Sequence, residues 1–333
     1  MPERNKLPVL DLICDQMRAV LAKSAELAPD AYATDVGLEQ MRRAYGVERR
    51  FWNEGGPTMA RTIDAQVPTP HGQVAIRCHL PRGGEGLPAV VYVHGGGWVL
   101  GDLDTHDRIM RALAHESGAA VVGIDYTLSP EAKFPVGVEQ CAALVRHLRE
   151  SGDRYHVDGT RLALAGDSGG ATMCLATALL LRDRADRGEP AVAVTALALF
   201  YGLYGLRDSA SRRLLGGPWD GLTEADLDYY LGCYLGDPAD AASPYVDCLG
   251  ADLSRGVPPC YLASAELDPL RDDTAALEAM LRRHQVACQH DEVPGVLHGF
   301  LHNSRMLDAA AVALQQGGAF LRRVFDEKTS KEN

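Results

Sequence analysis

One serine stands between glycines in the stretch "RLALAGDSGGATMC", residues 161–174. The residues before Ser168 are apolar like those of a buried strand, and a helical pattern follows it. G-x-S-x-G at such a junction makes a tight turn that exposes the serine hydroxyl, and glycine avoids collisions with neighbouring elements. Ser168 is therefore a candidate nucleophile for attack on a carbonyl carbon. A glycine-rich turn with an N-capping serine fits the pentapeptide equally well.

A second glycine-rich loop has the residue types needed to stabilise the charge that such an attack creates. The motif "HGGGW", residues 94–98, directly follows a predicted strand and presents backbone N–H groups without side chains. An oxyanion needs such donors, and we expect the amides of Gly96 and Gly97 to act together with that of Gly169. The predicted oxyanion-hole residues are Gly95, Gly96, Gly97 and Gly169. Trp98 is predicted to line the substrate pocket. The alternatives are a flexible loop or a phosphate cradle, but the lysine of a P-loop is missing.

A serine nucleophile needs a base, and the base needs an acid that holds it in the correct tautomer. Among eleven histidines, His298 is the best candidate base because it lies in the loop "VPGVLHGF" after the last predicted strand. Asp268 is the candidate acid because it follows the preceding strand and Pro269 fixes its turn. The predicted catalytic residues are thus Ser168, Asp268 and His298, in the chain order of α/β-hydrolases.

Other titratable residues near these motifs are assigned lesser roles. His94 is expected to hold the oxyanion loop, and His302 to be a surface or packing residue. Glu266 lies closer to its strand than Asp268, which favours a supporting role. Asp272 and Asp273 suit the first turn of a helix.

The elements that must position these residues follow an alternating pattern. The predicted strands are 62–68, 73–80, 89–94, 119–125, 161–165, 195–201, 260–265 and 288–293. The predicted helices are 104–117, 136–151, 169–186, 272–285 and 303–324. The first two strands flank the turn "TPHG" and predict an antiparallel hairpin. The later, continuously apolar strands indicate a parallel sheet covered on both faces.

Two regions lie outside this alternation. The spacing of apolar residues in the first 24 residues predicts an amphipathic helix. Residues 202–259, between the predicted strands 195–201 and 260–265, are far longer than a usual connection between strands. Thr223 is a plausible N-cap for a helix that ends before Gly236. We predict one α/β domain over 1–333, with a helical cap formed by 1–50 and an insertion at about 202–250. The lid aromatics Trp219, Tyr229, Tyr230 and Tyr234 either narrow the pocket or pack within the lid.

Composition excludes several other classes of protein. The chain has 333 residues with a net charge of −12 and no basic run longer than a pair, so nucleic acid is not expected as a partner. No segment resembles a membrane span or a secretory signal, which predicts a cytoplasmic protein. Eight cysteines without a C-x-x-C pair are expected to be reduced core residues. No metal site is predicted, because clustered ligands are missing and His298 and His302 lack the glutamate of H-E-x-x-H.

Five motifs lie between residues 94 and 300: HGGGW (94–98), DYTLSPEAKFP (125–135), GDSGG (166–170), DPL (268–270) and HGF (298–300). Together they resemble the hormone-sensitive-lipase-like branch of the α/β-hydrolase esterases. Segments 5–13, 100–110 and 201–223 resemble the bacterial acetyl esterases of that branch more closely. One departure is Gly169, where these enzymes usually carry alanine.

The resemblance implies an α/β-hydrolase fold with an eight-stranded, mostly parallel sheet and hydrolysis of short-chain carboxylic esters without metal or organic cofactor. It also implies a homodimer and contacts with a transcriptional activator of maltose utilisation and an α-galactosidase.

The leading hypothesis is a serine carboxylesterase that acts on small-molecule esters through an acyl-enzyme intermediate. The alternative hypothesis is a regulatory protein-interaction module on an esterase fold. An amidase remains open, whereas a dehalogenase would need a carboxylate in place of Ser168.

Overall fold

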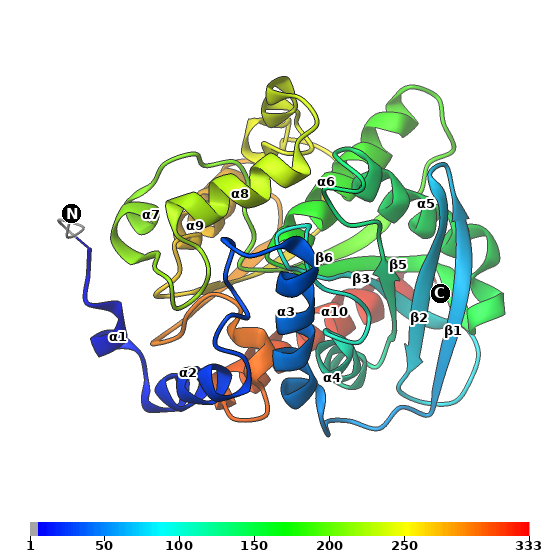
Figure 1. The fold of residues 1–333 in the computed structure, drawn as a ribbon. Coiled ribbons are helices and arrows are strands. Elements are labelled where there is room, and N and C mark those ends of the chain that lie inside the picture. The colour runs from blue at the N-terminus through cyan, green and yellow to red at the C-terminus, as the bar shows by residue number, and fades with distance from the viewer. Residues whose placement is uncertain (1–5, 333) are drawn as a thin grey trace.

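A single eight-stranded sheet forms the centre of the molecule (Figure 1). This computed structural model describes residues 6–332, with side chains through residue 327; the start of the predicted N-terminal helix, 1–5, lies outside the described residues. The strands are β1 (Arg61–Thr69), β2 (Gly72–Leu80), β3 (Leu87–Val93), β4 (Ala120–Asp125), β5 (Val157–Asp167), β6 (Val194–Phe200), β7 (Cys260–Ala265) and β8 (Cys288–Val293). Each of the eight predicted runs forms a strand, so the predicted fold class is confirmed.

The strand order is β1-β2-β4-β3-β5-β6-β7-β8. β1 and β2 form the predicted antiparallel hairpin, and β2 also pairs antiparallel with β4. All later pairings are parallel. Parallel strands bring their carboxyl ends to one edge of a sheet, and the residues that follow β3, β5, β7 and β8 carry the motifs predicted to do chemistry.

Helices cover both faces of the sheet. One layer contains α5 (Val136–Ser151), α6 (Gly169–Asp186) and α9 (Arg271–Arg283), and the other contains α4 (Asp107–Ser117) and α10 (Asp308–Glu332). Along β3, Val91 packs into the first core, whereas its neighbours Val90 and Tyr92 pack into the second. Both faces of the strands are therefore apolar. Burial of each side chain of this size stabilises the fold by about 1.5–3 kcal/mol.

The predicted single helix at the N-terminus is wrong. The chain forms α1 (Val9–Leu12) and α2 (Asp15–Leu27), followed by α3 (Leu38–Asn53). Between α1 and α2 the backbone is extended at Cys14, whose N–H donates to the Gly295 carbonyl at 2.9 Å. The Cys14 sulfur accepts from the Met17 amide as the N-cap of α2. A contact with the loop that carries His298 therefore interrupts the helical pattern.

The long insertion after β6 contains α7 (Ala210–Leu215) and α8 (Glu224–Tyr234). Thr223 caps α8 as predicted: its hydroxyl accepts from the Asp226 amide, and its own amide donates to the Asp226 carboxylate at 2.9 Å. The short 3-10 helices are η1 (Gly152–Tyr155), η2 (Pro238–Ala242), η3 (Cys248–Gly250) and η4 (Phe300–Asn303). We call residues 6–50 and 202–250 the cap segments.

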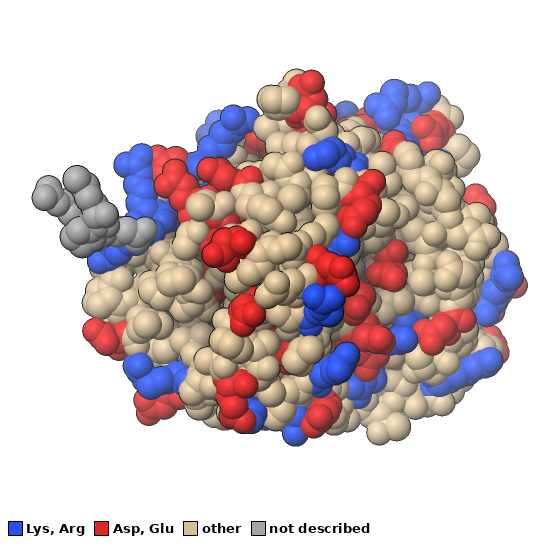
Figure 2. Space-filling view, viewed as in Figure 1, with Lys and Arg blue, Asp and Glu red and all other residues tan. Residues whose placement is uncertain are grey.

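The remaining sequence expectations concern cysteines, charge and membranes. All eight cysteines lie in the described part of the chain and are free, five of them buried. On the face shown in Figure 2, acidic and basic side chains are interspersed. Within the described residues, no helix combines the length and the apolar character that crossing a membrane requires.

Candidate active site

Ser168 occupies the sharp turn between β5 and α6. Its backbone has φ 51° and ψ −126°, a conformation that is strained for a residue with a side chain. A Cβ atom at Gly166 would lie 2.6 Å from the Val93 carbonyl oxygen, and one at Gly170 would collide with the same oxygen. The glycines around the serine thus let the turn pack against the end of β3, as the sequence predicts.

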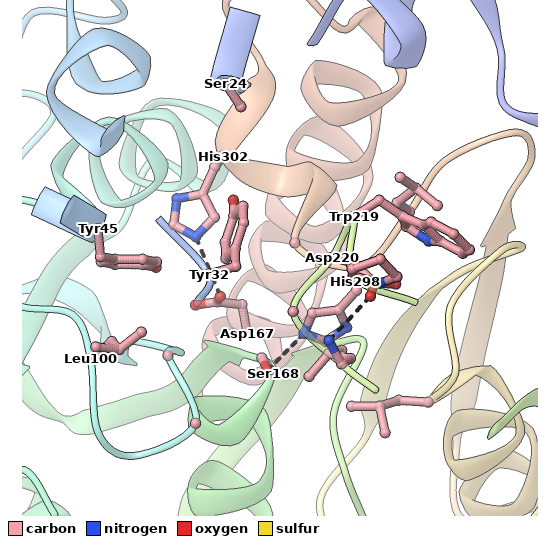
Figure 3. A pocket seen from close by; sticks show the side chains of 18 of the residues that line it. Ser24, Tyr32, Tyr45, Leu100, Asp167, Ser168, Trp219, Asp220, His298 and His302 are labelled. Carbon is pink, nitrogen blue, oxygen red and sulfur yellow. Dashed lines mark hydrogen bonds and ion pairs between the residues drawn. The ribbon is translucent and has the colours of Figure 1, made fainter. Parts of the chain in front are cut away.

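Ser168, His298 and Asp268 come together at the carboxyl ends of their strands. Figure 3 shows Ser168 and His298 facing each other. His298 Nε2 lies 2.9 Å from Ser168 Oγ, and His298 Nδ1 lies 2.7 Å from Asp268 Oδ2. Because a carboxylate accepts hydrogen bonds, Nδ1 carries the proton and Nε2 is left to accept from the serine hydroxyl. The second Asp268 oxygen accepts from the Leu270 amide at 2.7 Å, which fixes the carboxylate. This alignment is suited to proton removal from Ser168.

The electrostatic surroundings adjust His298 to that task. Burial by itself would lower the pKa of His298, because an imidazolium ion loses its hydration there. The charge of Asp268 and its hydrogen bond outweigh burial, and Asp220 adds to them, so the pKa of His298 is raised. The site therefore stabilises the imidazolium ion that proton transfer would create.

Neighbouring residues hold the His298 loop in place. Glu266 accepts a hydrogen bond from the Gly295 amide at 2.7 Å, which gives it the supporting role predicted for it. The ring of Tyr201 packs edge-on against His298, with ring centroids 4.9 Å apart. Tyr201 has a positive φ of 41° and follows β6 directly. Sequence reasoning missed Tyr201, because its contact with His298 is formed only by the fold.

The glycine loop after β3 turns toward Ser168. Gly96 and Gly97 have φ values of 109° and 58°, and both line the same cavity as Ser168 and Gly169. The prediction that Gly95 contributes an oxyanion-hole amide is wrong, since its N–H already donates to Asp167 Oδ1 at 3.0 Å. Gly96, Gly97 and Gly169 therefore remain the candidate donors.

Gly169 also leaves room for Trp98. A Cβ atom at position 169 would lie 3.2 Å from the Trp98 indole ring, tighter than ordinary van der Waals contact. Trp98 lies in the cavity wall and stacks on Tyr234 of the cap, with ring centroids 4.2 Å apart. An alanine at this position would therefore require the Trp98 indole to shift by a few tenths of an ångström.

Asp167 is a structural residue of the site that sequence reasoning did not single out. Its Oδ1 accepts from the Tyr92 hydroxyl at 2.6 Å and from the Gly95 amide. Burial would raise the pKa of Asp167, but the nearby His106 and the hydrogen bond from Tyr92 hold it well below its usual range. The carboxylate thereby ties the end of β5 to β3 and to the glycine loop. Its place beside Ser168 in GDSGG is the only signal in the sequence that could have indicated it.

Three histidines surround Asp167. His94 Nδ1 lies 2.9 Å from the Gly95 carbonyl oxygen, and its ring stacks on Tyr126, which confirms its predicted role in holding the loop. Burial lowers the pKa of His94 to about 4, so its ring is neutral. His302 is buried, with a side chain 3% exposed, which makes it a packing residue and not a surface residue.

His106, Asp167 and His302 are also the one group among the described residues with the ligand types and proximity to hold a metal ion. Their ligand atoms lie within 4.8 Å of one another. One Asp167 oxygen is already occupied by Tyr92 and Gly95, and the positive charge of Arg49 acts on His302. The occupied oxygen and the positive charge near His302 favour a packing role for this cluster over a bound cation.

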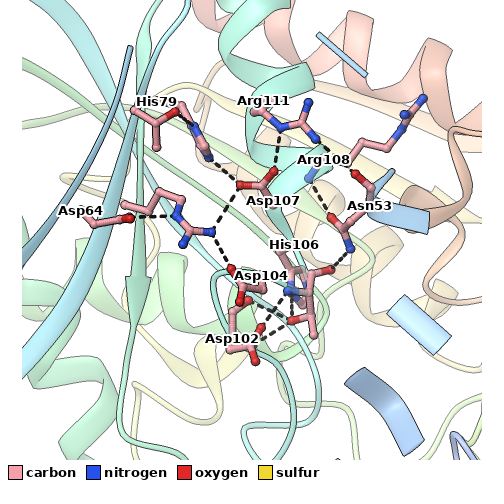
Figure 4. A network of polar contacts seen from close by, with 12 residues as sticks. Asn53, Asp64, His79, Asp102, Asp104, His106, Asp107, Arg108 and Arg111 are labelled. Atoms are coloured by element: carbon pink, nitrogen blue, oxygen red, sulfur yellow. Dashed lines mark hydrogen bonds and ion pairs between the residues drawn. The ribbon is translucent and has the colours of Figure 1, made fainter. Parts of the chain in front are cut away.

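A polar network holds the segment that follows the glycine loop (Figure 4). The Asp102 carboxylate accepts from the Thr105 amide at 2.7 Å, and the Thr105 hydroxyl accepts from the Asp102 amide at 2.8 Å. Asn53 of α3 bonds the Thr105 carbonyl and accepts from the Arg108 amide, both at 2.8 Å. The first turn of α4 is therefore anchored to α3, which places His106 beneath the glycine loop.

A cavity of about 320 Å³ opens above Ser168 and His298. The cap segments complete its walls, with Tyr45 and Arg49 from α3 on one side and Trp219, Asp220 and Tyr230 from the insertion on the other. The lid aromatics divide between the two predicted roles. Trp219 and Tyr230 line the cavity, Tyr234 packs behind Trp98, and Tyr229 packs edge-on against Tyr230.

Comparison with known proteins agrees with this geometry. A family model described as the alpha/beta hydrolase fold matches residues 90–302. A hyperthermophilic esterase from the archaeon Pyrobaculum calidifontis is 32% identical, with a TM-score of 0.85 over 94% of this chain and 98% of that chain. A thermophilic, thermostable carboxylesterase cloned from a metagenomic library is 30% identical, with a TM-score of 0.82 over 87% and 98%. A thermostable esterase from Pseudomonas putida is 26% identical, with a TM-score of 0.84 over 94% and 98%. The chain therefore belongs to the alpha/beta hydrolase fold family.

Proposed function

We propose that this protein is a serine carboxylesterase in which Ser168 is the nucleophile, His298 the base and Asp268 the residue that orients the base. The observation that carries the proposal is a chain of two hydrogen bonds at the wall of a cavity. His298 Nδ1 lies 2.7 Å from Asp268 Oδ2, and His298 Nε2 lies 2.9 Å from Ser168 Oγ. The esterases and carboxylesterases among the similar structures support the same reaction.

The proposed reaction begins when His298 Nε2 takes the proton of Ser168 and the serine oxygen attacks the ester carbonyl. The amides of Gly96, Gly97 and Gly169 hold the oxyanion, and Asp268 stabilises the imidazolium ion. The tetrahedral intermediate collapses, and the alcohol leaves with the proton from His298. Water activated by the same histidine then attacks the acyl-enzyme, which releases the acid and restores Ser168.

The shape of the cavity supports short acyl chains as substrates. Its volume of about 320 Å³ lies at the low end of the range for small-molecule sites. Trp98 and Tyr230 stand close to the oxyanion loop, where a Cβ atom at Gly97 would already collide with the Tyr230 ring. We propose that the cap segments form a lid on a single domain and restrict the enzyme to acetyl and other short acyl esters.

Labelling with a serine-directed fluorophosphonate followed by peptide mapping tests the nucleophile. The expected result is stoichiometric modification of Ser168, which is lost in Ser168→Ala. Labelling of a different residue, or a Ser168→Ala variant that still hydrolyses p-nitrophenyl acetate at the original rate, would overturn the proposal.

A series of p-nitrophenyl esters tests the acyl preference. We expect kcat/KM to be highest for acetate or butyrate and to fall for octanoate and palmitate, because the longer chains exceed the cavity. A maximum at palmitate would contradict the short-chain proposal while leaving the esterase proposal intact.

The other expectations stay predictions. They are the cytoplasmic location, the homodimer, the contacts with the maltose-utilisation activator and the α-galactosidase, and the reaction without a cofactor. The regulatory-module hypothesis predicts that Ser168→Ala retains partner binding, and it gains no support from the completed catalytic geometry.

A further inference from the structure

One end of the cavity is formed by two consecutive residues of the insertion that the proposed reaction does not use. Trp219 and Asp220 lie between α7 and α8 and line the cavity together with Ser168 and His298. Figure 3 shows them beside His298, whereas His302 and Tyr45 stand on the opposite side. A group on the substrate would therefore meet Trp219 and Asp220 while its ester lies at Ser168.

Asp220 has an unsatisfied oxygen at this position. The residue is only 8% exposed, and its Oδ1 accepts from the Leu222 amide at 3.2 Å. Its Oδ2 is buried and has no hydrogen-bond partner among the described residues. Buried carboxyl oxygens are nearly always paired, because loss of hydration is costly without a compensating partner. The unpaired oxygen is therefore available to a partner group on a ligand.

The charges around the cavity indicate which kind of partner. Burial and the charge of Asp268 together raise the pKa of Asp220 to about 7, although His298 and the backbone amides of Leu222 and Gly217 act in the opposite direction. Within residues 6–327, Arg49 is the only lysine or arginine that lines the cavity, and it pairs with Glu48 at 3.0 Å on α3. His302 is held neutral, since burial lowers its pKa well below the usual value. Asp220 therefore lacks a protein cation of its own in the resting site.

Trp219 adds a second feature that favours a cation. Its indole lines the same end of the cavity as Asp220. Indole faces attract ammonium ions, and such contacts strengthen when water is excluded. A carboxylate next to an indole is a combination suited to an ammonium group.

We propose that Asp220 and Trp219 bind a positively charged ammonium group of the ester substrate and so determine its specificity. This inference rests on the proposed esterase function of the same cavity. It assigns the enzyme a preference for esters of amino alcohols or amino acids over uncharged esters of the same shape.

Two pairs of isosteric esters test the preference. Acetylcholine and 3,3-dimethylbutyl acetate place the charge, or its neutral equivalent, on the alcohol side. Methyl 4-(trimethylammonio)butanoate and methyl 5,5-dimethylhexanoate place it on the acyl side. The measured quantity is the ratio of kcat/KM for the charged ester to that for the neutral ester, in the wild-type enzyme and in Asp220→Asn.

We expect Asp220→Asn to lower this ratio by about 10- to 100-fold for at least one pair, because asparagine keeps the shape and removes the charge. The wild-type ratio should rise with pH through about 7, where Asp220 ionises, and the variant ratio should stay flat. The quaternary charge does not titrate, and the His298 dependence cancels between the two esters. Asp228→Asn, an exposed carboxylate on α8 outside this cavity, is the matched control and should leave the ratio unchanged.

Two outcomes would overturn the inference. One is an unchanged ratio in Asp220→Asn, and the other is an equal change of the ratio in Asp228→Asn. A loss that is equal on charged and neutral esters would show that Asp220 acts through His298 and not on the substrate. Failure of the esterase proposal is distinguishable, because neither ester would then be hydrolysed by the wild-type enzyme. Thermal unfolding of the variant checks that its fold is intact.

Discussion

Two buried carboxylates, Asp268 and Asp167, lie near the nucleophile and face histidines, yet their geometries differ. Asp268 lies 2.7 Å from His298, which is itself 2.9 Å from Ser168. Asp167 lies 3.6 Å from His106 and 3.8 Å from His302, both beyond hydrogen-bond length. The short contacts of Asp167 are instead with Tyr92 and Gly95.

The difference teaches that an Asp–His pair is not by itself a catalytic pair. His298 contacts the Ser168 hydroxyl and lines a cavity that can hold a substrate, so a proton can pass from Ser168 to His298. His106 instead contacts the buried Thr105 hydroxyl at 3.0 Å, and Thr105 does not line the cavity. The Asp167 carboxylate holds the backbone of the oxyanion loop. Asp268 prepares His298 to act as a base. Asp167 fixes the loop whose amides stabilise the oxyanion that forms after His298 has taken the proton of Ser168.

The largest expected effect is that of Asp268→Asn. An amide at this position favours the wrong tautomer of His298, so we expect kcat for p-nitrophenyl acetate to fall about 10⁴-fold with the fold intact. Steady-state kinetics and thermal unfolding measure the two quantities. A loss of less than about tenfold would show that another group orients His298.

The second prediction concerns the pH dependence of activity, which reports on His298, the histidine that Asp268 contacts. Proton transfer needs neutral His298, whose pKa is raised by Asp268 with contributions from Asp220 and Asp167. Activity should therefore fall as pH decreases, with a midpoint above the usual histidine pKa of about 6.5. Below that midpoint, activity should fall about tenfold for each pH unit. The pH profile of kcat/KM measures the midpoint, and Asp220→Asn should move it to lower pH. A rate that stays flat on acidification would contradict His298 as the base.

Asp167→Asn should have a smaller effect on the rate and a larger effect on stability. The amide keeps one acceptor for Tyr92 or Gly95 but removes the charge that both contacts share. We expect kcat to fall about 10- to 100-fold through a misplaced oxyanion loop, and the free energy of unfolding to fall by about 1–3 kcal/mol. Urea unfolding and kinetics measure both. A loss as large as that of Asp268→Asn would place Asp167 in the chemical step.

His302→Gln is expected to have the smallest effect. His302 stands four residues after His298 but packs against His106, with ring centroids 4.5 Å apart. We expect kcat to change less than about threefold and stability to fall by about 1 kcal/mol. His298→Gln is the matched comparison and should lower kcat about as much as Asp268→Asn. Equal losses in the two variants would remove the distinction between the two Asp–His groups.

Much of the fold follows from local sequence patterns. The eight strands and the main helices that cover the sheet were predictable, because strands buried on both faces are continuously apolar and glycine marks their ends. The N-terminal helix was predicted wrongly, since the break at Cys14 depends on a bond to Gly295 from the far end of the chain. No local pattern records a contact between residues so distant in sequence.

The sequence by itself determined the types of chemistry available at the strand ends: a serine in a glycine turn, a glycine loop, an acid and a histidine. Only the tertiary structure decided that Gly95 is bonded to Asp167, that Tyr201 packs on His298, and that Asp220 faces the cavity with a free oxygen. Residue type and strand pattern are local properties, whereas the partner of a polar atom depends on which distant elements the fold brings within 3 Å of it.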